Sequence, residues 1–127
     1  MKFWQTPSFR RAAALGFFGL IILGSSVPGR HMPSVFKLTP DKLLHGAEYT
    51  LFGILLVRWL RVALPGLSEM GLCGMVLLSG GLAAALDENY QRLIPNRTPD
   101  IRDWFVDLAG LLTGCVVYLV LKRRLKN

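Results

Sequence analysis

The sequence predicts an all-α integral membrane protein whose transmembrane helices form a four-helix bundle. Hydrophobic residues make up 52% of the 127 residues and the mean hydropathy is +0.41, which is more apolar than a soluble domain of this length needs. The apolar residues also gather into four runs, each near the roughly 20 residues that a helix needs to cross a bilayer. Lysines and arginines lie at the ends of these runs, as they do in membrane helices.

The four runs define one predicted membrane domain over residues 1–127, with spans at about 12–27, 43–64, 67–86 and 104–121. The first span is short and follows Arg10 and Arg11. The second contains Arg58 near its end, where a long side chain can reach the interface. The fourth begins at Trp104 and is followed by KRRLK.

The N-terminal stretch MKFWQTPSFRR, with the apolar run after it, is similar to a secretory signal peptide. No A-x-A-like cleavage pattern follows Leu23, so we expect the first span to be retained, and its cleavage is the alternative. The topology of the other spans is the same in both cases, because three spans that start outside also end inside.

The charges predict that both termini face the cytoplasm. With that orientation, nine of the 15 lysines and arginines lie on the inner side, as the orientation rule favours. We therefore attribute the net charge of +7 to the membrane and expect no nucleic-acid partner. Seven of the eight acids fall on the outer side, with Glu69 as the inner one. Because acids contribute little to orientation, this clustering indicates a polar site at the outer face.

Helical spacing groups the polar residues of the second span on one face. Asp41, His45 and the neighbours Glu48 and Tyr49 are separated by about one and two helical turns, and residues so spaced share a face. His45 in this position is a candidate general base, metal ligand or headgroup contact. The alternative is a neutral histidine that only satisfies Asp41 or Asp103 within the bundle.

The third and fourth spans bring further polar residues to the same end. The fourth span opens with Asp103 and Asp107 on the same face as Gly110 and Gly114, a small-xxx-small spacing that permits close helix contact. Ionisable groups just inside a membrane face the bundle interior and pair with one another. The predicted polar site comprises residues from three spans and the loop between the last two: Asp41, Lys42, His45, Glu48, Tyr49, Glu88, Gln91, Arg97, Arg102, Asp103 and Asp107.

The two arginines of this set lie in or next to the loop between the last two spans. We expect Arg97 and Arg102 to reach over the mouth of the bundle, since a guanidinium group matches carboxylates and phosphates. Arg97 with Glu88 and Gln91 is a candidate site for a phosphate or a peptide carboxylate. The alternative is a purely structural contact between helices, in which these residues hold the loop against the second span. The NRTPD stretch indicates a turn that holds Arg97 in place.

In their order and spacing, these motifs resemble the VanZ-like membrane proteins. The residues that carry the resemblance are the DKLLH stretch at 41–45, SSVP at 25–28, Glu88, Gln91, Arg97, Asp103, Asp107 and Gly110. The resemblance extends over about residues 12–120. It implies a small multi-pass protein of the bacterial cytoplasmic membrane. The family's namesake is linked to resistance to teicoplanin, which acts on outer-face cell-wall precursors, whereas most members have no established activity.

One position departs from the family pattern. Many members carry asparagine where this chain has Asp107, and a carboxylate cannot donate the hydrogen bond that an amide can. We therefore expect either a more acidic polar network in this chain, or an Asp107 that is protonated or paired with Arg97, Arg102 or Lys42.

Three functions fit these residues. The first, which we favour, is a non-catalytic site for an outer-leaflet lipid headgroup or a cell-wall precursor. The second is a small membrane hydrolase or transferase acting on a lipid-linked phosphate or ester, with His45 or Glu88 as the acid–base group. No serine or cysteine nucleophile lies near the cluster, which weighs against it. The third is a structural or assembly protein whose polar cluster only locks the helices. The sequence leaves the oligomeric state open.

We expect no cofactor and no metal. The spacing matches no strong metal-binding signature, and the two cysteines, Cys73 and Cys115, lie within spans without a C-x-x-C pattern. If a divalent ion is bound, the candidate ligands are the acids and the histidine of the polar site, namely Asp41, His45, Glu88, Asp103 and Asp107.

Overall fold

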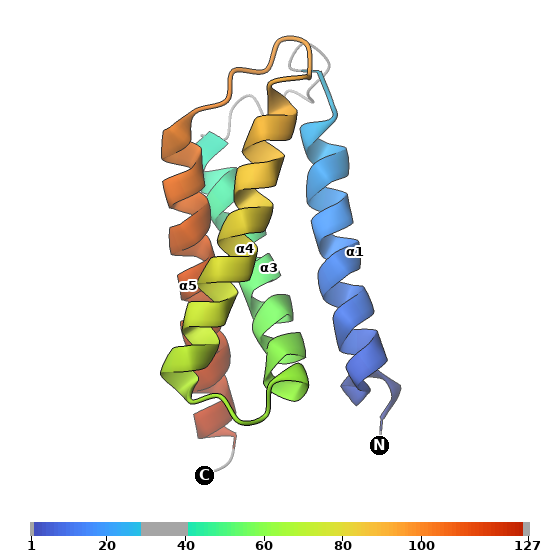
Figure 1. The fold of residues 1–127 in the computed structure, drawn as a ribbon, viewed down its shortest axis with the longest axis vertical. Helices are drawn as coiled ribbons and strands as arrows, with labels where there is room; N and C mark the ends of the chain where they lie inside the picture. Colours follow the sequence, from blue (N-terminus) through green and yellow to red (C-terminus); the bar gives the residue numbers. More distant parts are fainter. Residues whose placement is uncertain (1, 29–40, 126–127) are drawn as a thin grey trace.

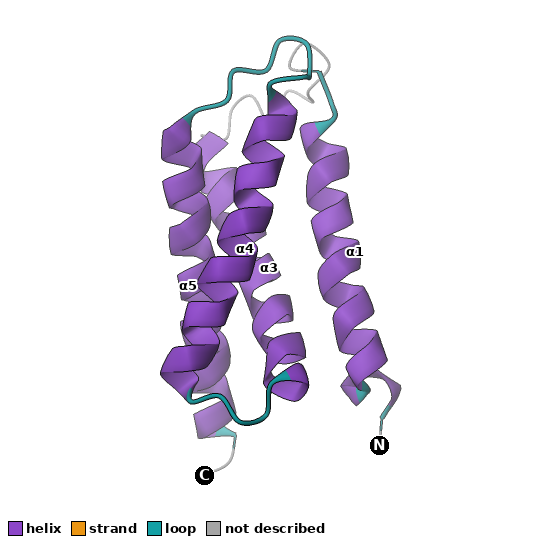
Figure 2. Cartoon of the chain, in the orientation of Figure 1, coloured by secondary structure: helices purple, strands orange, loops and turns teal. Residues whose placement is uncertain are grey.

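The computed structural model describes residues 2–28 and 41–125, apart from the side chain of Asp41. A short 3-10 helix, η1 (Phe3–Gln5), precedes four long helices: α1 (Pro7–Ser25), α3 (Asp41–Ala63), α4 (Glu69–Gln91) and α5 (Ile101–Arg124) (Figure 1). The described part of the chain contains no strand (Figure 2). The predicted all-α, four-helix class is therefore confirmed.

Successive helices run in opposite directions along the bundle (Figure 1). At each end of the bundle, the end of one helix therefore lies beside the start of the next. We call the end where α1 and α4 finish and α3 and α5 begin the polar end, and the other the basic end. The basic end carries the start of α1 and the end of α5. It also carries most of the lysines and arginines that the structure describes, namely Lys2, Arg10, Arg11, Arg58, Arg61, Lys122, Arg123 and Arg124.

Three helix starts are capped by the residue types that favour such positions. Thr6 accepts a hydrogen bond from the Phe9 N–H at the start of α1, and Ser68 accepts one from the Gly71 N–H at the start of α4. Asp100 accepts one from the Arg102 N–H at the start of α5. Each cap satisfies one of the backbone donors that a helix leaves unpaired in its first turn.

Three of the helices, α1, α4 and α5, are long and apolar enough to cross a membrane. The outward faces of the bundle carry large exposed apolar side chains, which in a bilayer contact lipid. Among them are Leu15, Leu20, Leu23, Leu51, Leu78, Leu82, Leu112 and Leu121. Helix α3 contacts each of the other three helices. Its position lets Tyr49 and Val57 be fully buried.

The closest helix pair is α3 and α5, and glycine makes the approach possible. A Cβ added to Gly110 would lie 2.8 Å from the Gly46 carbonyl oxygen, and one added to Gly114 would overlap the Thr50 carbonyl. A Cβ on Gly53, in the facing helix, would lie 2.7 Å from the Leu111 carbonyl oxygen. The predicted small-xxx-small contact is confirmed, and it fixes α5 against the face of α3 that carries His45.

Candidate functional site

The polar end of the bundle contains a cluster of buried polar side chains from three helices. Because Cβ periodicity places His45 and Tyr49 on one face of α3, both point toward the first turns of α5 and the last turns of α4. We call the following residues the polar cluster: His45, Tyr49, Asp87, Glu88, Gln91, Asp103 and Asp107, all of them buried.

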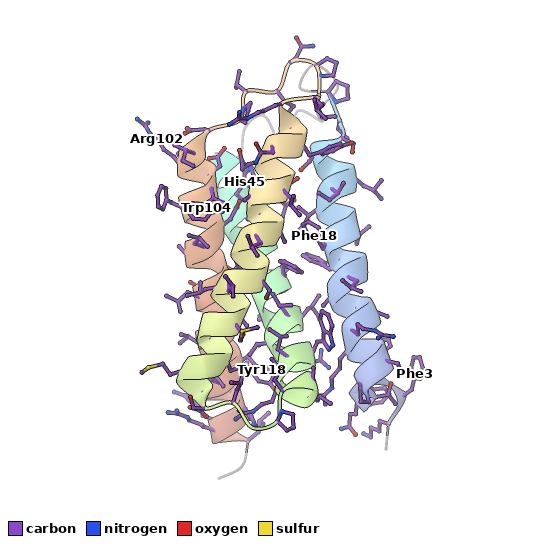
Figure 3. All side chains as sticks on the ribbon, viewed as in Figure 1. Phe3, Phe18, His45, Arg102, Trp104 and Tyr118 are labelled. Atoms are coloured by element: carbon purple, nitrogen blue, oxygen red, sulfur yellow. The ribbon has the colours of Figure 1, made fainter. Side chains whose placement is uncertain are left out.

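The centre of the polar cluster is a contact between α3 and α5. His45 Nδ1 lies 3.0 Å from Asp107 Oδ1, and Asp107 is completely excluded from solvent, with 0% exposure. His45 Nε2 lies 4.0 Å from Asp103 Oδ2. Figure 3 shows His45 at the polar end of the bundle. The expectation that Asp107 pairs with Arg97, Arg102 or Lys42 is therefore wrong, since its partner is the histidine one helix away.

A second chain of hydrogen bonds crosses from α3 through α4 to α1. The Tyr49 hydroxyl donates to Asp87 Oδ2 (3.4 Å), and the Gln91 side-chain amide lies within 3.5 Å of the same oxygen. Gln91 also donates to the Ser25 hydroxyl at the end of α1 (3.4 Å). Asp87 and Ser25 were not among the predicted site residues. Asp87 could have been included, because it stands one helical turn before Gln91 and beside Glu88.

Several buried carboxylate oxygens lack a partner. Among the described residues, neither oxygen of Glu88 accepts a hydrogen bond, and the same holds for Asp87 Oδ1 and Asp107 Oδ2. Glu88 is only 8% exposed. Buried polar groups are ordinarily hydrogen-bonded, because an unpaired one costs free energy. These oxygens are thus available to a hydroxyl, an ammonium group or a cation.

At the rim of the polar cluster, Lys42 connects α3 to the start of α5. Its ammonium group lies 3.0 Å from Asp103 Oδ1 and 3.5 Å from Asp100 Oδ2. Asp100 stands outside the membrane-spanning helices. The Arg102 backbone N–H, 2.9 Å from Asp100 Oδ1, and the nearby Lys42 charge hold the pKa of the Asp100 carboxyl below its ordinary value.

The two predicted arginines do not close over the mouth of the bundle. Arg97 donates from Nε to the Val27 carbonyl (3.1 Å) and from Nη2 to the Gly24 carbonyl (3.0 Å). Arg97 therefore holds the loop against the end of α1. The alternative, a structural contact between the loop and the second span, is also wrong. The side chain of Arg102 is exposed and points away from the bundle (Figure 3).

The turn that positions Arg97 lies slightly earlier than the NRTPD stretch suggested. The Arg97 N–H donates to the Ile94 carbonyl (3.2 Å), which closes a turn over residues 94–97. Asn96 has a φ of 60°, in the left-handed region that asparagine tolerates better than most residues. Pro95 before it suits the first central position of such a turn.

A pocket with a volume of about 300 Å³ opens between α4 and α5 beside the polar cluster. The Trp104 indole N–H donates to the Gly81 carbonyl (2.9 Å), which holds the ring against α4. Arg92 is exposed at this end. Sequence reasoning missed the pocket and the place of Arg92 in its lining, because the pocket exists only where two helices and the loop between them meet. Its lining consists of Ala85, Glu88, Asn89, Arg92, Pro99, Ile101 and Trp104.

Two predicted site residues, Glu48 and Asp41, and the predicted set of metal ligands remain to be placed. Glu48 is half-buried, one turn further along α3 than His45. His45, Glu88 and Asp107 each offer a ligand atom within 4.8 Å of the others, so these three of the candidate ligands are close enough to hold a metal ion together. The side chain of Asp41, the first residue of α3, lies outside the described part of the structure.

Within residues 2–28 and 41–125, four antiparallel helices, apolar outside and polar at one end inside, define a multi-pass α-helical membrane protein with a buried ionisable site. The chain belongs to the VanZ/LLP1 family, whose sequence model matches residues 12–122. Neither a curated protein nor a solved structure gives a significant match to it.

Proposed function

We propose that this protein binds the phosphate-bearing headgroup of an envelope lipid at its polar end. The headgroup belongs to a membrane lipid or to a lipid-linked cell-wall precursor, since both present phosphate on an apolar anchor. The observation that carries the proposal is the pocket of about 300 Å³ between α4 and α5. Pockets of this size with a few converging polar groups are typical of small-ligand sites.

The lining of the pocket suits an amphipathic anion. Arg92 offers a planar guanidinium group, which matches phosphate oxygens. Ile101 and Trp104 provide the apolar side, and tryptophan is favoured at the depth of lipid headgroups. Glu88 supplies two carboxylate oxygens that have no partner in the described part of the chain, and these can accept hydrogen bonds from a headgroup hydroxyl or ammonium group.

The proposal places the protein in the cytoplasmic membrane with the polar end outside. The basic side chains at the opposite end favour the cytoplasmic side. A cysteine introduced at Asn96 would then react with a membrane-impermeant maleimide in intact cells, whereas one at Gly66 would react only after lysis. Gly66 lies in the loop between α3 and α4, at the basic end. The reverse labelling pattern would refute the orientation.

Native mass spectrometry of the detergent-purified protein tests the binding. We expect the wild type to carry an extra mass that matches a phosphate-bearing lipid, and the mass tells the two lipid sources apart. Arg92→Ala should lose that mass. Arg102→Ala, which removes an exposed arginine near the same end but not from the pocket, should keep it. A wild type without adducts, even after incubation with anionic lipid, would refute the proposal.

A second function, a membrane hydrolase or transferase, is favoured by one specific observation. The buried His45–Asp107 pair stands close to Glu88, which also lines the pocket. A histidine oriented by a carboxylate is a competent acid–base group. Turnover of a phospholipid or lipid pyrophosphate that disappears in both His45→Ala and Glu88→Gln would establish this function. Absence of turnover across such a panel would leave the binding function.

The purely structural alternative rests on the Lys42 and Arg97 contacts, which connect three helices and a loop. It predicts that substitutions in the polar cluster lower the thermal unfolding midpoint and leave the pattern of bound lipid unchanged. Comparing the bound mass and the unfolding midpoint of the same variants separates this alternative from the binding function.

A further inference from the structure

We propose that His45, Glu88 and Asp107 form a binding site for a divalent cation, and that Zn²⁺ is the ion they suit best. The site lies inside the polar end of the bundle, where α3, α4 and α5 each contribute one ligand. The proposal rests on the three ligands themselves and not on headgroup binding, although Glu88 also lines the lipid pocket.

The first argument is geometric. One ring nitrogen of His45 and one carboxylate oxygen each of Glu88 and Asp107 all lie within 4.8 Å of one another. Zinc holds such ligands at about 2.0–2.2 Å, so small inward movements of the side chains complete the coordination. Because the ligands come from three helices, their spacing along the chain matches none of the short metal motifs.

The second argument is the unsatisfied state of the ligands. Both oxygens of Glu88 and Oδ2 of Asp107 lack a hydrogen-bond partner among the described residues. Glu88 is 8% exposed and Asp107 is 0% exposed, so water has little access to them. An ionised carboxylate that is buried without a partner is destabilising, and coordination of a cation removes that cost.

The third argument is the balance of charge. The polar cluster contains four buried acids, Asp87, Glu88, Asp103 and Asp107. Among the described residues, the Lys42 ammonium group contacts one of them, Asp103. His45 is neutral when it acts as a metal ligand, so three acidic charges remain, and a divalent cation would neutralise two of them. Buried charges in membrane helices are paired with one another or with a ligand.

The identity of the ligands selects the ion. An imidazole nitrogen favours first-row transition ions and zinc, whereas Mg²⁺ and Ca²⁺ prefer oxygen ligands alone. Three protein ligands leave a fourth zinc position for water or an exogenous group. Glu88 lines the pocket between α4 and α5 as well as the proposed site, so an exogenous group in the pocket lies next to the ion.

Zinc content after equilibrium dialysis tests the proposal. The tag-free, detergent-purified protein is loaded with ZnCl₂, dialysed against metal-free buffer and measured by elemental mass spectrometry. We expect one zinc ion per wild-type chain, and a decrease in zinc affinity of at least about tenfold in Glu88→Gln and in Asp107→Asn. Zinc should also raise the unfolding midpoint of the wild type and leave that of Glu88→Gln unchanged.

Three controls make the result specific. Asp100→Asn removes an acid at the same end but outside the proposed site, and it should retain zinc. Cys73→Ala should also retain zinc, which excludes binding at the Cys73 thiol, and Arg92→Ala should retain it even if headgroup binding is lost. Glu88→Gln is expected to fold, since Glu88 has no hydrogen-bond partner to lose among the described residues. A wild type without zinc, or equal zinc in Glu88→Gln, would overturn the proposal.

Discussion

His45 on α3 and Asp107 on α5 are joined by a buried contact of 3.0 Å between Nδ1 and Oδ1. The contact lies one helical turn from Gly110, where the two backbones approach so closely that no Cβ fits. The tight helix contact therefore brings the two polar groups within hydrogen-bonding distance. Helix packing and site geometry in this protein are two consequences of the same interface.

Substitutions at Asp107 should separate the hydrogen bond from the charge. Asp107→Asn keeps an acceptor oxygen for the imidazole N–H, so we expect an unfolding midpoint near that of the wild type. Asp107→Ala leaves His45 buried without this partner, which costs about 1–3 kcal/mol. Thermal unfolding in detergent with a chelator present measures both. Equal destabilisation by the two variants would show that the charge, and not the hydrogen bond, stabilises the pair.

The interface itself should be intolerant of a single methyl group at Gly114. A Cβ there overlaps the Thr50 carbonyl of α3, and backbone atoms cannot move aside as a flexible side chain can. We expect Gly114→Ala to destabilise the protein by about 1–3 kcal/mol or more, as measured by thermal unfolding in detergent.

Gly16 supplies the matched control for this substitution. It also stands inside a helix, and nothing lies within 4 Å of a Cβ built on it. Since alanine has a higher helix propensity than glycine, Gly16→Ala should leave the unfolding midpoint unchanged or raise it. A similar loss of stability in Gly16→Ala and Gly114→Ala would contradict the assignment of the close contact to α3 and α5.

The fold could be predicted because the sequence pattern that indicates it lies within each helix. Four apolar runs near membrane length, with arginines and lysines at their ends, are visible without tertiary information. The end of α4 was harder to predict from the sequence, because the hydropathy falls at Asp87 while the helix continues to Gln91. Three polar residues of this last part, Asp87, Glu88 and Gln91, are buried inside the bundle, which favours continuation of the helix.

The site was predictable only in part, for a related reason. Helical periodicity placed His45 and Asp107 on inward faces, and both are buried in the polar cluster. Periodicity does not say which helices are neighbours, so the His45–Asp107 contact and the pocket beside Arg92 required the fold. The partner of Arg97 also required it, since Gly24 and Val27 lie at the other end of the sequence and offer only backbone carbonyls.

The contacts of Arg97 predict a local effect on dynamics. In Arg97→Ala, the loop over residues 92–100 loses its hydrogen bonds to the Val27 and Gly24 carbonyls. We expect faster amide hydrogen exchange in this loop and around the end of α1. Arg102→Ala, which removes an exposed side chain, should leave the exchange unchanged. Exchange measured by mass spectrometry in detergent decides the matter, and identical exchange in the two variants would refute the role given to Arg97.

Asp100 predicts a pH-dependent contribution to stability with a defined sign. The Arg102 N–H and the Lys42 charge favour the ionised carboxylate and so hold its pKa below the ordinary value of about 3.8. A group whose pKa is lowered by folding adds stability above its unfolded pKa and loses that contribution as the pH falls through its folded pKa. The contribution is therefore present at neutral pH and absent in strong acid.

Asp100→Asn isolates this contribution, because asparagine still caps the start of α5 but cannot form the ion pair with Lys42. We expect the wild type to unfold at a slightly higher temperature than the variant at pH 7. The difference should shrink as the pH falls below the ordinary range of aspartate, while the remaining acids titrate alike in both proteins. Parallel melting curves from pH 7 to pH 3 measure it. A difference that stays constant over this range would mean that the cap geometry, and not the charge of Asp100, distinguishes the two.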